Sequence, residues 1–334
     1  MLKKYSFVKT LLTFFLIQIS LCATTDYKIS LEEYKLSGIT QLEKEMDREL
    51  TKVDYWSQYL INQDTQFGYI EEYSNILACN KEKSTLTLYV KGSDEHYEFK
   101  REHNAYTGKN RGDKVREGDQ KTPIGIYKIV EKLSKETNLD PFYGPLAFVT
   151  SYPNSYDKLR GKNGSGIWIH GLPTKRTRDK FTRGCIAINN SNIECLGQNI
   201  KIDNTLLIID SKEVKQNISK ETLASLLSEL YQWRYAWLYN DITSYLNFYS
   251  DDFIRDDGMK FSRFQNYKTR VFKKIEKKTI IFKNINIVPY PNTENIYQIT
   301  FNEYYKSDSF EFIGEKILMV KVDDNHKMKI FTEK

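Results

Sequence analysis

The stretch 167–188 constrains the fold of this chain more than any other, because two short apolar segments in it frame a histidine and a cysteine. The first segment alternates apolar residues and ends at His170, and the second begins directly after Cys185. Such alternation predicts strands. The fourteen residues between His170 and Cys185 are mostly polar and basic and include Gly171 and Pro173, which predicts a loop. Two strand ends joined by one loop can bring an imidazole and a thiol within hydrogen-bond reach, the minimum for a Cys–His nucleophile pair.

Cys185 is flanked by residues that suit a nucleophilic thiol. A thiolate is the attacking species, and a neighbouring imidazole favours it by forming an ion pair. Gly184 allows close approach of a substrate and, with Cys185, offers backbone N–H groups to a developing oxyanion. Arg183 adds a positive charge for a substrate carboxylate or for the thiolate. No Asn or Asp is placed to orient His170, so a backbone carbonyl must do so, and Gly171 is the nearest. The alternative, a buried cysteine beside an unrelated histidine, is less favoured by these flanking residues.

Other chemistries have little support in the sequence. There is no HExxH pattern and no CxxC pair for a metal, and no Gly-x-Ser-x-Gly turn for a serine nucleophile. We therefore expect no metal and no cofactor. The four histidines are His96, His103, His170 and His326.

The first 23 residues have the pattern of a secretory signal peptide. A basic start that includes Lys3 precedes a short apolar core, Leu11 to Leu21, and small residues follow up to Ala23. About a dozen apolar residues are too few to span a bilayer comfortably. Cys22 leaves a lipoprotein signal open, although the large Leu21 before it disfavours one. Removal of residues 1–23 lowers the formal charge from +6 to +3. A charge this small and this scattered excludes a nucleic-acid footprint.

The remaining chain is long enough for more than one domain. Residues 24–83 are expected to be a helical segment, because apolar residues recur at helical spacing within 26–78. Residues 84–211 contain many short alternating runs separated by Gly and Pro, which indicates a mostly β domain. Residues 212–334 begin with a linker and a helix capped by Ser219, followed by strands, which indicates an α+β domain. The fold class expected is therefore multidomain α+β.

Three cysteines remain after the predicted cleavage, so at least one thiol of an exported protein would be unpaired. A bridge between Cys79 and Cys195 would leave Cys185 free. Two small buried residues are an equally good interpretation of Cys79 and Cys195, and the sequence does not decide between them.

Three motifs in order resemble the L,D-transpeptidase (YkuD) catalytic domain. They are Gly118-Asp119 with Thr122-Pro123-Ile124-Gly125-Ile126-Tyr127, then Ile169-His170-Gly171, then Thr182-Arg183-Gly184-Cys185-Ile186. The resemblance covers about residues 84–211 and implies a β-sandwich-like periplasmic enzyme that processes peptidoglycan stem peptides without a cofactor. It implies that Cys185 is the nucleophile, that His170 is the general base and acid, and that the Gly171 carbonyl orients His170. It also implies an oxyanion hole from the Gly184 and Cys185 amides. The candidates for substrate binding are Arg183, Thr182, Trp168 and Tyr143.

One departure from this family pattern bears on the reaction. Where the family usually has Arg after Gly-Cys-Ile, this chain has Ala187. The three-part layout, with a C-terminal part similar to the NTF2-like fold, resembles the L,D-carboxypeptidases that set helical cell shape in Helicobacter and Campylobacter relatives. We therefore expect trimming of tetrapeptides to tripeptides by removal of the terminal D-alanine. Cross-linking of stem peptides is the first alternative.

Two further questions stay open at the level of sequence. The second alternative for the function is a non-catalytic wall-binding protein, in which Trp233, Trp237 and tyrosines contact glycan. Whatever the function, a glycan or another wall ligand is one candidate ligand of the C-terminal domain. The helical segment 24–83 either folds onto its own chain or exchanges with a second copy as a homodimer. The resemblance favours the dimer.

Overall fold

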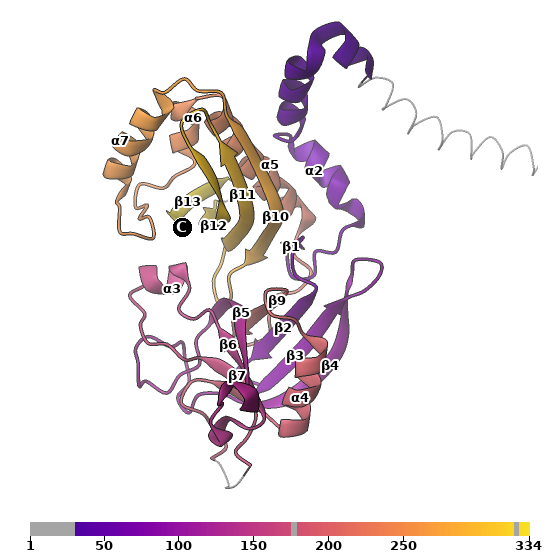
Figure 1. Cartoon of the computed structure of the whole chain (residues 1–334), viewed down its shortest axis with the longest axis vertical. Coiled ribbons are helices and arrows are strands. Elements are labelled where there is room, and N and C mark those ends of the chain that lie inside the picture. Colours follow the sequence, from indigo (N-terminus) through magenta and orange to yellow (C-terminus); the bar gives the residue numbers. More distant parts are fainter. Residues whose placement is uncertain (1–30, 175–178, 324–326) are drawn as a thin grey trace, which may run out of the picture. The chain divides into compact units, whose positions relative to one another are not determined.

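A computed structural model describes residues 31–174, 179–323 and 327–334, which fall into two compact units divided between Lys52 and Val53 (Figure 1). In the first unit, residues 31–49 are helical. The predicted signal peptide lies outside the described residues. Among the helices that are described, none combines the length and the apolar character that crossing a bilayer requires.

The second unit begins with helix α2, Val53–Tyr59, and the short η1, Leu60–Asn62. The Trp56 ring of α2 stacks on Tyr231 at 5.2 Å between ring centroids. The helical prediction for 26–78 is wrong beyond η1, because β1 (Tyr69–Ile70) and β2 (Asn75–Asn80) follow. Every residue of β2 is buried, so it lacks the alternation by which a half-buried strand is recognised.

Eight strands close into a barrel in the order β2-β3-β4-β8-β7-β6-β5-β9. The expected sandwich-like arrangement is thus replaced by a closed barrel, because β2 pairs in parallel with the last strand, β9. Its interior is filled by apolar side chains from all around the wall, including Leu77, Phe148, Ile186 and Leu207. The other elements are β3 Thr85–Lys91, β4 Tyr97–Tyr106, β5 Gly125–Ser134, η2 Lys135–Thr137, η3 Pro141–Tyr143, β6 Leu146–Thr150, α3 Ser155–Leu159, β7 Trp168–His170, β8 Ile186–Ile188, α4 Asn190–Asn199 and β9 Thr205–Asp210.

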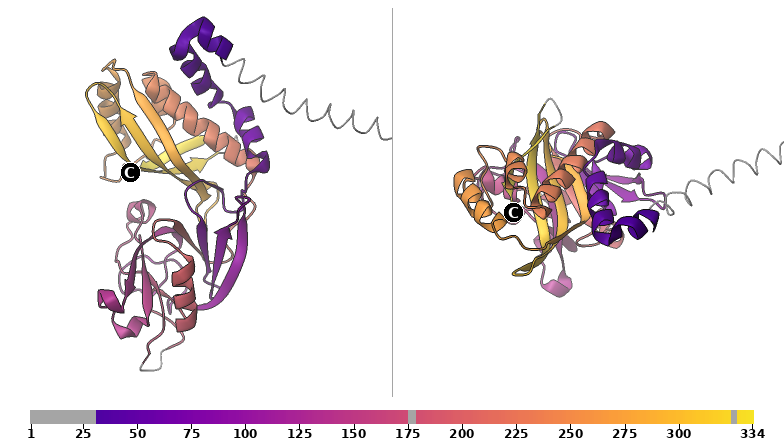
Figure 2. Two further views of the ribbon diagram at one scale, coloured as in Figure 1. Left: turned by 45° about the vertical axis from the view of Figure 1, so that its right-hand side comes forward. Right: turned by 90° about the horizontal axis from the view of Figure 1, so that it is seen from above.

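The C-terminal part is a helix-and-sheet layer, as predicted. Helix α5, Lys220–Leu238, begins at Ser219, whose hydroxyl accepts a hydrogen bond from the Thr222 N–H. It lies along an antiparallel sheet (Figure 2), and Trp233 packs its ring against Phe282 of β10. The remaining elements are α6 Ile242–Asn247, α7 Phe261–Phe272, β10 Thr279–Pro289, β11 Ile296–Lys306, β12 Glu311–Val322 and β13 Met328–Glu333.

The start of the barrel domain is less simple than the predicted division between residues 83 and 84, where the helical segment was expected to end. β1 extends the C-terminal sheet by pairing with β10, whereas β2, only a few residues later, belongs to the barrel. Polar contacts also join the two parts: Lys128 pairs with Glu315, and Asn154 donates to the Tyr290 hydroxyl at 3.1 Å. The C-terminal domain therefore contacts the barrel domain directly.

Candidate active site

β7 and β8 are parallel neighbours, and their register decides which side chains meet. Ile169 pairs with Ile186, and His170 pairs with Ala187. Both isoleucines are completely buried in the barrel core. Because side chains alternate along a strand, His170 and Ala187 lie on the opposite face from the isoleucines. Cys185, one residue before Ile186, continues that same alternation. The fold thus places the predicted nucleophile and base on one face of adjacent strands.

The imidazole of His170 is held in a defined state. It is completely buried, and its Nδ1 lies 2.6 Å from the carbonyl oxygen of Gly171. A carbonyl only accepts, so Nδ1 carries the proton, and in the neutral ring Nε2 is then the basic nitrogen. This is the orienting contact that the sequence analysis predicted. Gly171 has no room for a side chain, because an added Cβ would lie 2.4 Å from Asn190 Oδ1.

The thiol of Cys185 is half-buried, and its Sγ lies 3.4 Å from the carbonyl oxygen of Gly166. Gly166 is not among the site residues predicted from the sequence. It stands just before the strand that carries His170, in a loop without a chemical motif, so no sequence signal marked it. The contact fixes one side of the thiol, and Trp168 and His170 follow Gly166 on the same segment.

The turn that carries the thiol is built around Thr182. Its side-chain oxygen accepts a hydrogen bond from the Gly184 N–H at 3.0 Å and donates one to the Cys185 carbonyl at 2.6 Å. Gly184 has φ +135°, and an added Cβ would lie 2.9 Å from the Lys121 carbonyl oxygen. The Gly184 amide is therefore engaged within the turn, and its oxyanion role, which stays a prediction, requires that this bond be exchanged. Thr182 itself is buried, with its hydroxyl turned into the protein.

We expect Thr182→Val to lower kcat about tenfold with little change in KM, because the valine keeps the volume but cannot hold the turn. Thr182→Ser keeps the hydroxyl and should restore most of the activity. Steady-state kinetics of the two variants checks this. Equal activity of the valine and serine variants would show that the hydroxyl does not position the thiol.

The predicted substrate-binding residues fall into two groups, an aromatic pair next to His170 and two residues of the thiol turn. The Tyr143 ring lies 4.8 Å from the Trp168 ring and 5.1 Å from the His170 ring, centroid to centroid. These three side chains form one aromatic wall. Arg183 is exposed beside the thiol turn, where its charge can reach a carboxylate in solvent. Substrate binding by Tyr143, Trp168, Arg183 and Thr182 stays a prediction.

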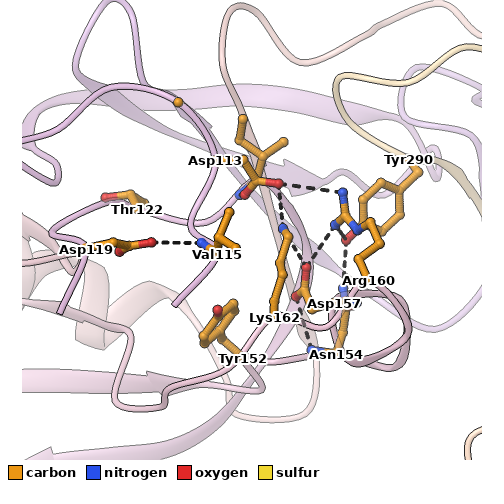
Figure 3. A network of polar contacts seen from close by, with 12 residues as sticks. Asp113, Val115, Asp119, Thr122, Tyr152, Asn154, Asp157, Arg160, Lys162 and Tyr290 are labelled. Atoms are coloured by element: carbon orange, nitrogen blue, oxygen red, sulfur yellow. Dashed lines mark hydrogen bonds and ion pairs between the residues drawn. The ribbon is translucent and has the colours of Figure 1, made fainter. Parts of the chain in front are cut away.

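The loop that carries the Gly118-Asp119 motif packs against the turn that holds Cys185. The Asp119 carboxylate accepts N–H groups from Val115, Arg116 and Lys121 (Figure 3 draws the first) and pairs with Lys114 at 3.0 Å. Burial alone would raise the pKa of Asp119, but these hydrogen bonds outweigh it and lower the pKa to about 2. Asp119 thereby fixes the segment whose Lys121 carbonyl packs against Gly184.

Asp119 should make the free energy of unfolding depend on pH in the acid range. Its pKa in the folded chain is about 2, below the usual 3.8. Its stabilisation is therefore complete above about pH 4 and is lost as the pH falls through the folded pKa. We expect Asp119→Asn to cost about 2 kcal/mol at pH 6 and much less at pH 2. Urea unfolding at both pH values measures this, and a cost that does not depend on pH would contradict it.

The other two cysteines of the described chain are free thiols, and the Cys79–Cys195 bridge is absent. Cys79 is completely buried in the barrel, where desolvation raises its pKa to about 12, so it is inert as a nucleophile. Cys195 lies on α4, with Arg101 3.5 Å from its Sγ. Neither lies on the β7–β8 face that carries His170, since Cys79 belongs to β2 and Cys195 to α4.

A cavity of about 440 Å³ lies on the C-terminal domain, between α7 and the curved sheet. Of the two tryptophans considered for glycan contact, Trp237 lines this cavity, whereas Trp233 is completely buried and unavailable to a ligand. The buried position of Trp233 is stabilised by hydrogen bonds: its indole N–H donates to the Tyr249 hydroxyl, and that hydroxyl donates to the Glu333 carboxylate. The tryptophan pair is therefore split between core and cavity wall.

Comparison with known families fits this geometry. The L,D-transpeptidase catalytic domain matches residues 74–209, and the Cds6 C-terminal NTF2-like domain matches residues 225–334. A protein from Escherichia coli K12 named as an L,D-transpeptidase, YafK, is 34% identical over 116 residues. That match spans 34% of this chain and 42% of YafK, so it covers less than half of that relative's length. The chain belongs to the L,D-transpeptidase family.

Solved structures narrow the comparison. The helical cell shape determining protein Pgp2 from Campylobacter jejuni is 40% identical, with a TM-score of 0.77 over 85% of this chain and 99% of Pgp2. Bd1075 from Bdellovibrio bacteriovorus is 28% identical, with a TM-score of 0.64 over 82% of this chain and 96% of Bd1075. The similarity to Pgp2 therefore extends over more of this chain than the barrel or the NTF2-like domain alone. The expected three-part α+β organisation is confirmed.

Proposed function

We propose that this protein is a cysteine-dependent peptidoglycan L,D-carboxypeptidase that trims tetrapeptide stems to tripeptides. Membership of the L,D-transpeptidase family supports action on peptidoglycan. The observation that carries the chemistry is the register of β7 and β8, by which His170, with its proton on Nδ1, and Cys185, the residue before β8, fall on the same face. The similarity to a helical cell shape determining protein over 85% of this chain supports a role in cell shape.

The reaction proceeds through a thioester. His170 Nε2 takes the proton of the Cys185 thiol, and the sulfur attacks the carbonyl of the residue before the terminal D-alanine. The developing oxyanion lies against the amides of the thiol turn. His170 then returns its proton to the departing amine of D-alanine, and a thioester remains on Cys185. Next, His170 deprotonates a water molecule, which attacks the thioester and releases the tripeptide.

Ala187 supports water as the acceptor. It pairs with His170 across β7 and β8 and is completely buried, so no charged side chain extends from this position to engage an incoming peptide. The family pattern places an arginine there. Without that cation, the site has one feature fewer with which to hold the carboxylates of an acceptor stem.

Transpeptidation is the alternative, because it shares every step up to the thioester and differs only in the acceptor. Incubating the purified protein with a disaccharide tetrapeptide separates the two. We expect mass spectrometry to find tripeptide and free D-alanine. Accumulation of cross-linked dimers in place of tripeptide would contradict hydrolysis, and the absence of both products would contradict the family of reactions altogether.

Three further assignments rest on this proposal. The predicted signal peptide and the wall substrate support a periplasmic location. A homodimer through the helical segment is supported by apolar side chains exposed on residues 31–49, among them Leu36 and Ile39. A glycan or peptide ligand of the C-terminal domain is supported by its cavity, which combines the aromatic Trp237 and Tyr305 with charged groups.

A further inference from the structure

A second cavity lies on the catalytic domain, separate from the thiol. It has a volume of about 520 Å³, within the range of sites that hold small ligands. Four segments form it: the β2–β3 turn at 81–84, the chain after β4 at 107–112, residues 180–181, and residues 211–212 after β9. Neither Cys185 nor His170 lines it.

The lining of this cavity is strongly basic. Five of its side chains are cationic and one, Glu82, is acidic. Within the described part of the chain, none of the five cations lies within ion-pair distance of a carboxylate, so their charge is not neutralised by the protein. The five cations are Lys81, Lys109, Arg111, Lys180 and Lys212.

Lys81 anchors the floor of the cavity. Its Nζ donates to the Gly112 carbonyl at 2.6 Å and also to the Thr122 carbonyl. Burial lowers its pKa to about 8, although the attraction of Asp113 opposes the shift. An anion in the cavity would relieve this cost of a desolvated cation.

The cavity also has an apolar wall and a direct connection to the thiol turn. The Phe181 ring lies 5.1 Å from Lys109 Nζ in a cation–π contact. The Lys109 N–H donates to the Thr182 carbonyl at 3.0 Å, and the Thr182 hydroxyl in turn holds the Cys185 carbonyl. The chain at Thr182 thus connects the cavity to the nucleophile, while the thiol itself faces Gly166.

We propose that this basic cavity binds the carboxylates of a neighbouring peptidoglycan stem peptide, a second strand beyond the one that is cleaved. Carboxylates can form ion pairs with the cations of the cavity, and the aliphatic parts of a peptide can pack against Phe181. An inorganic anion would make only the first of these two interactions. The inference rests on the proposed function, because it takes peptidoglycan as the substrate. It gives the enzyme a preference for stems within the cross-linked wall over isolated stems.

The test uses the full chain with Cys185→Ala, so that binding is measured without turnover. Isothermal titration compares a monomeric disaccharide tetrapeptide with a cross-linked dimeric muropeptide. We expect the dimer to bind about tenfold more tightly, because several exposed ion pairs each contribute modestly. Adding Lys109→Ala, Arg111→Ala and Lys212→Ala should remove this advantage, as should amidation of the carboxylates on the dimer's second stem.

The control variant removes the same charge elsewhere. Lys135→Ala, Lys158→Ala and Lys201→Ala alter exposed lysines outside the cavity and should keep the advantage of the dimer. Equal binding of dimer and monomer by the unaltered cavity would overturn the inference while leaving the proposed function standing. Loss of binding only to phosphatidylglycerol vesicles or to inorganic phosphate in the cavity variant would also overturn it, in favour of a phosphate ligand. Failure of both muropeptides to bind at all would instead contradict the proposed function.

Discussion

Replacing Cys185 with alanine is expected to reduce D-alanine release from a disaccharide tetrapeptide by at least about four orders of magnitude, as loss of a covalent nucleophile does in other enzymes. The reason is structural. Cys185 is the thiol that the β7–β8 register places on the same face as a histidine whose tautomer is fixed by Gly171. Mass spectrometry of the released amino acid and of the remaining tripeptide measures the loss.

Cys195→Ala is the matched control. Cys195 is also a partly exposed free thiol, but it lies on α4 beside Arg101 and not on the β7–β8 face. Its removal should leave activity unchanged. Alkylating reagents should inactivate the protein through Cys185, and EDTA should not, because the mechanism uses no metal. Tripeptide formation that persists in Cys185→Ala would show that the nucleophile is a different residue.

The catalytic pair could be predicted from the sequence because its signal is local. Alternation up to His170 and from Ile186 onward marks two strands, and the residues with chemical function stand at their ends. The contact of His170 with the Gly171 carbonyl could be predicted in the same way, since the two residues are neighbours in the chain. Such local patterns can be recognised in a single sequence because they do not depend on contacts with distant parts of the chain.

Long-range features could not be predicted in this way. Closure of the barrel depends on the parallel pairing of β2 with β9, two fully buried runs far apart in the chain. The contact of the Gly166 carbonyl with the thiol depends on a backbone position that no residue type marks. The basic cavity draws its cations from four separated segments, so the sequence shows only scattered lysines where the fold collects them.

The second large expected effect concerns stability and arises from the polar network around Asp157. Asp157 is completely buried, and its carboxylate lies 2.9 Å from both Arg160 and Lys162 and accepts the Tyr127 hydroxyl (Figure 3 shows the two cations). Asp113 pairs with Lys162 as well. We expect Asp157→Asn to destabilise the chain by about 3–5 kcal/mol, the usual cost of leaving one member of a buried ion pair without its partner. Urea unfolding measures this.

Asp94→Asn provides the comparison, because Asp94 pairs with His96 on an exposed turn and its loss should cost no more than about 0.5 kcal/mol. Equal stability of the two variants would contradict a structural role for the buried network.

The same network should control activity, because the segment from Asp157 to Gly166 ends beside the thiol. A loosened segment would release the Gly166 carbonyl from Cys185 Sγ, so Asp157→Asn should lower kcat even where the protein is still folded.

Adding Lys162→Met to Asp157→Asn removes the uncompensated cation, and this should recover part of the lost stability, since a buried ion pair can often be replaced by apolar groups. It should not recover kcat in full, because methionine cannot replace the bonds by which Lys162 ties Asp113 to this segment. Recovery of stability and activity in parallel would show that the network acts only through folding, and not by positioning the thiol.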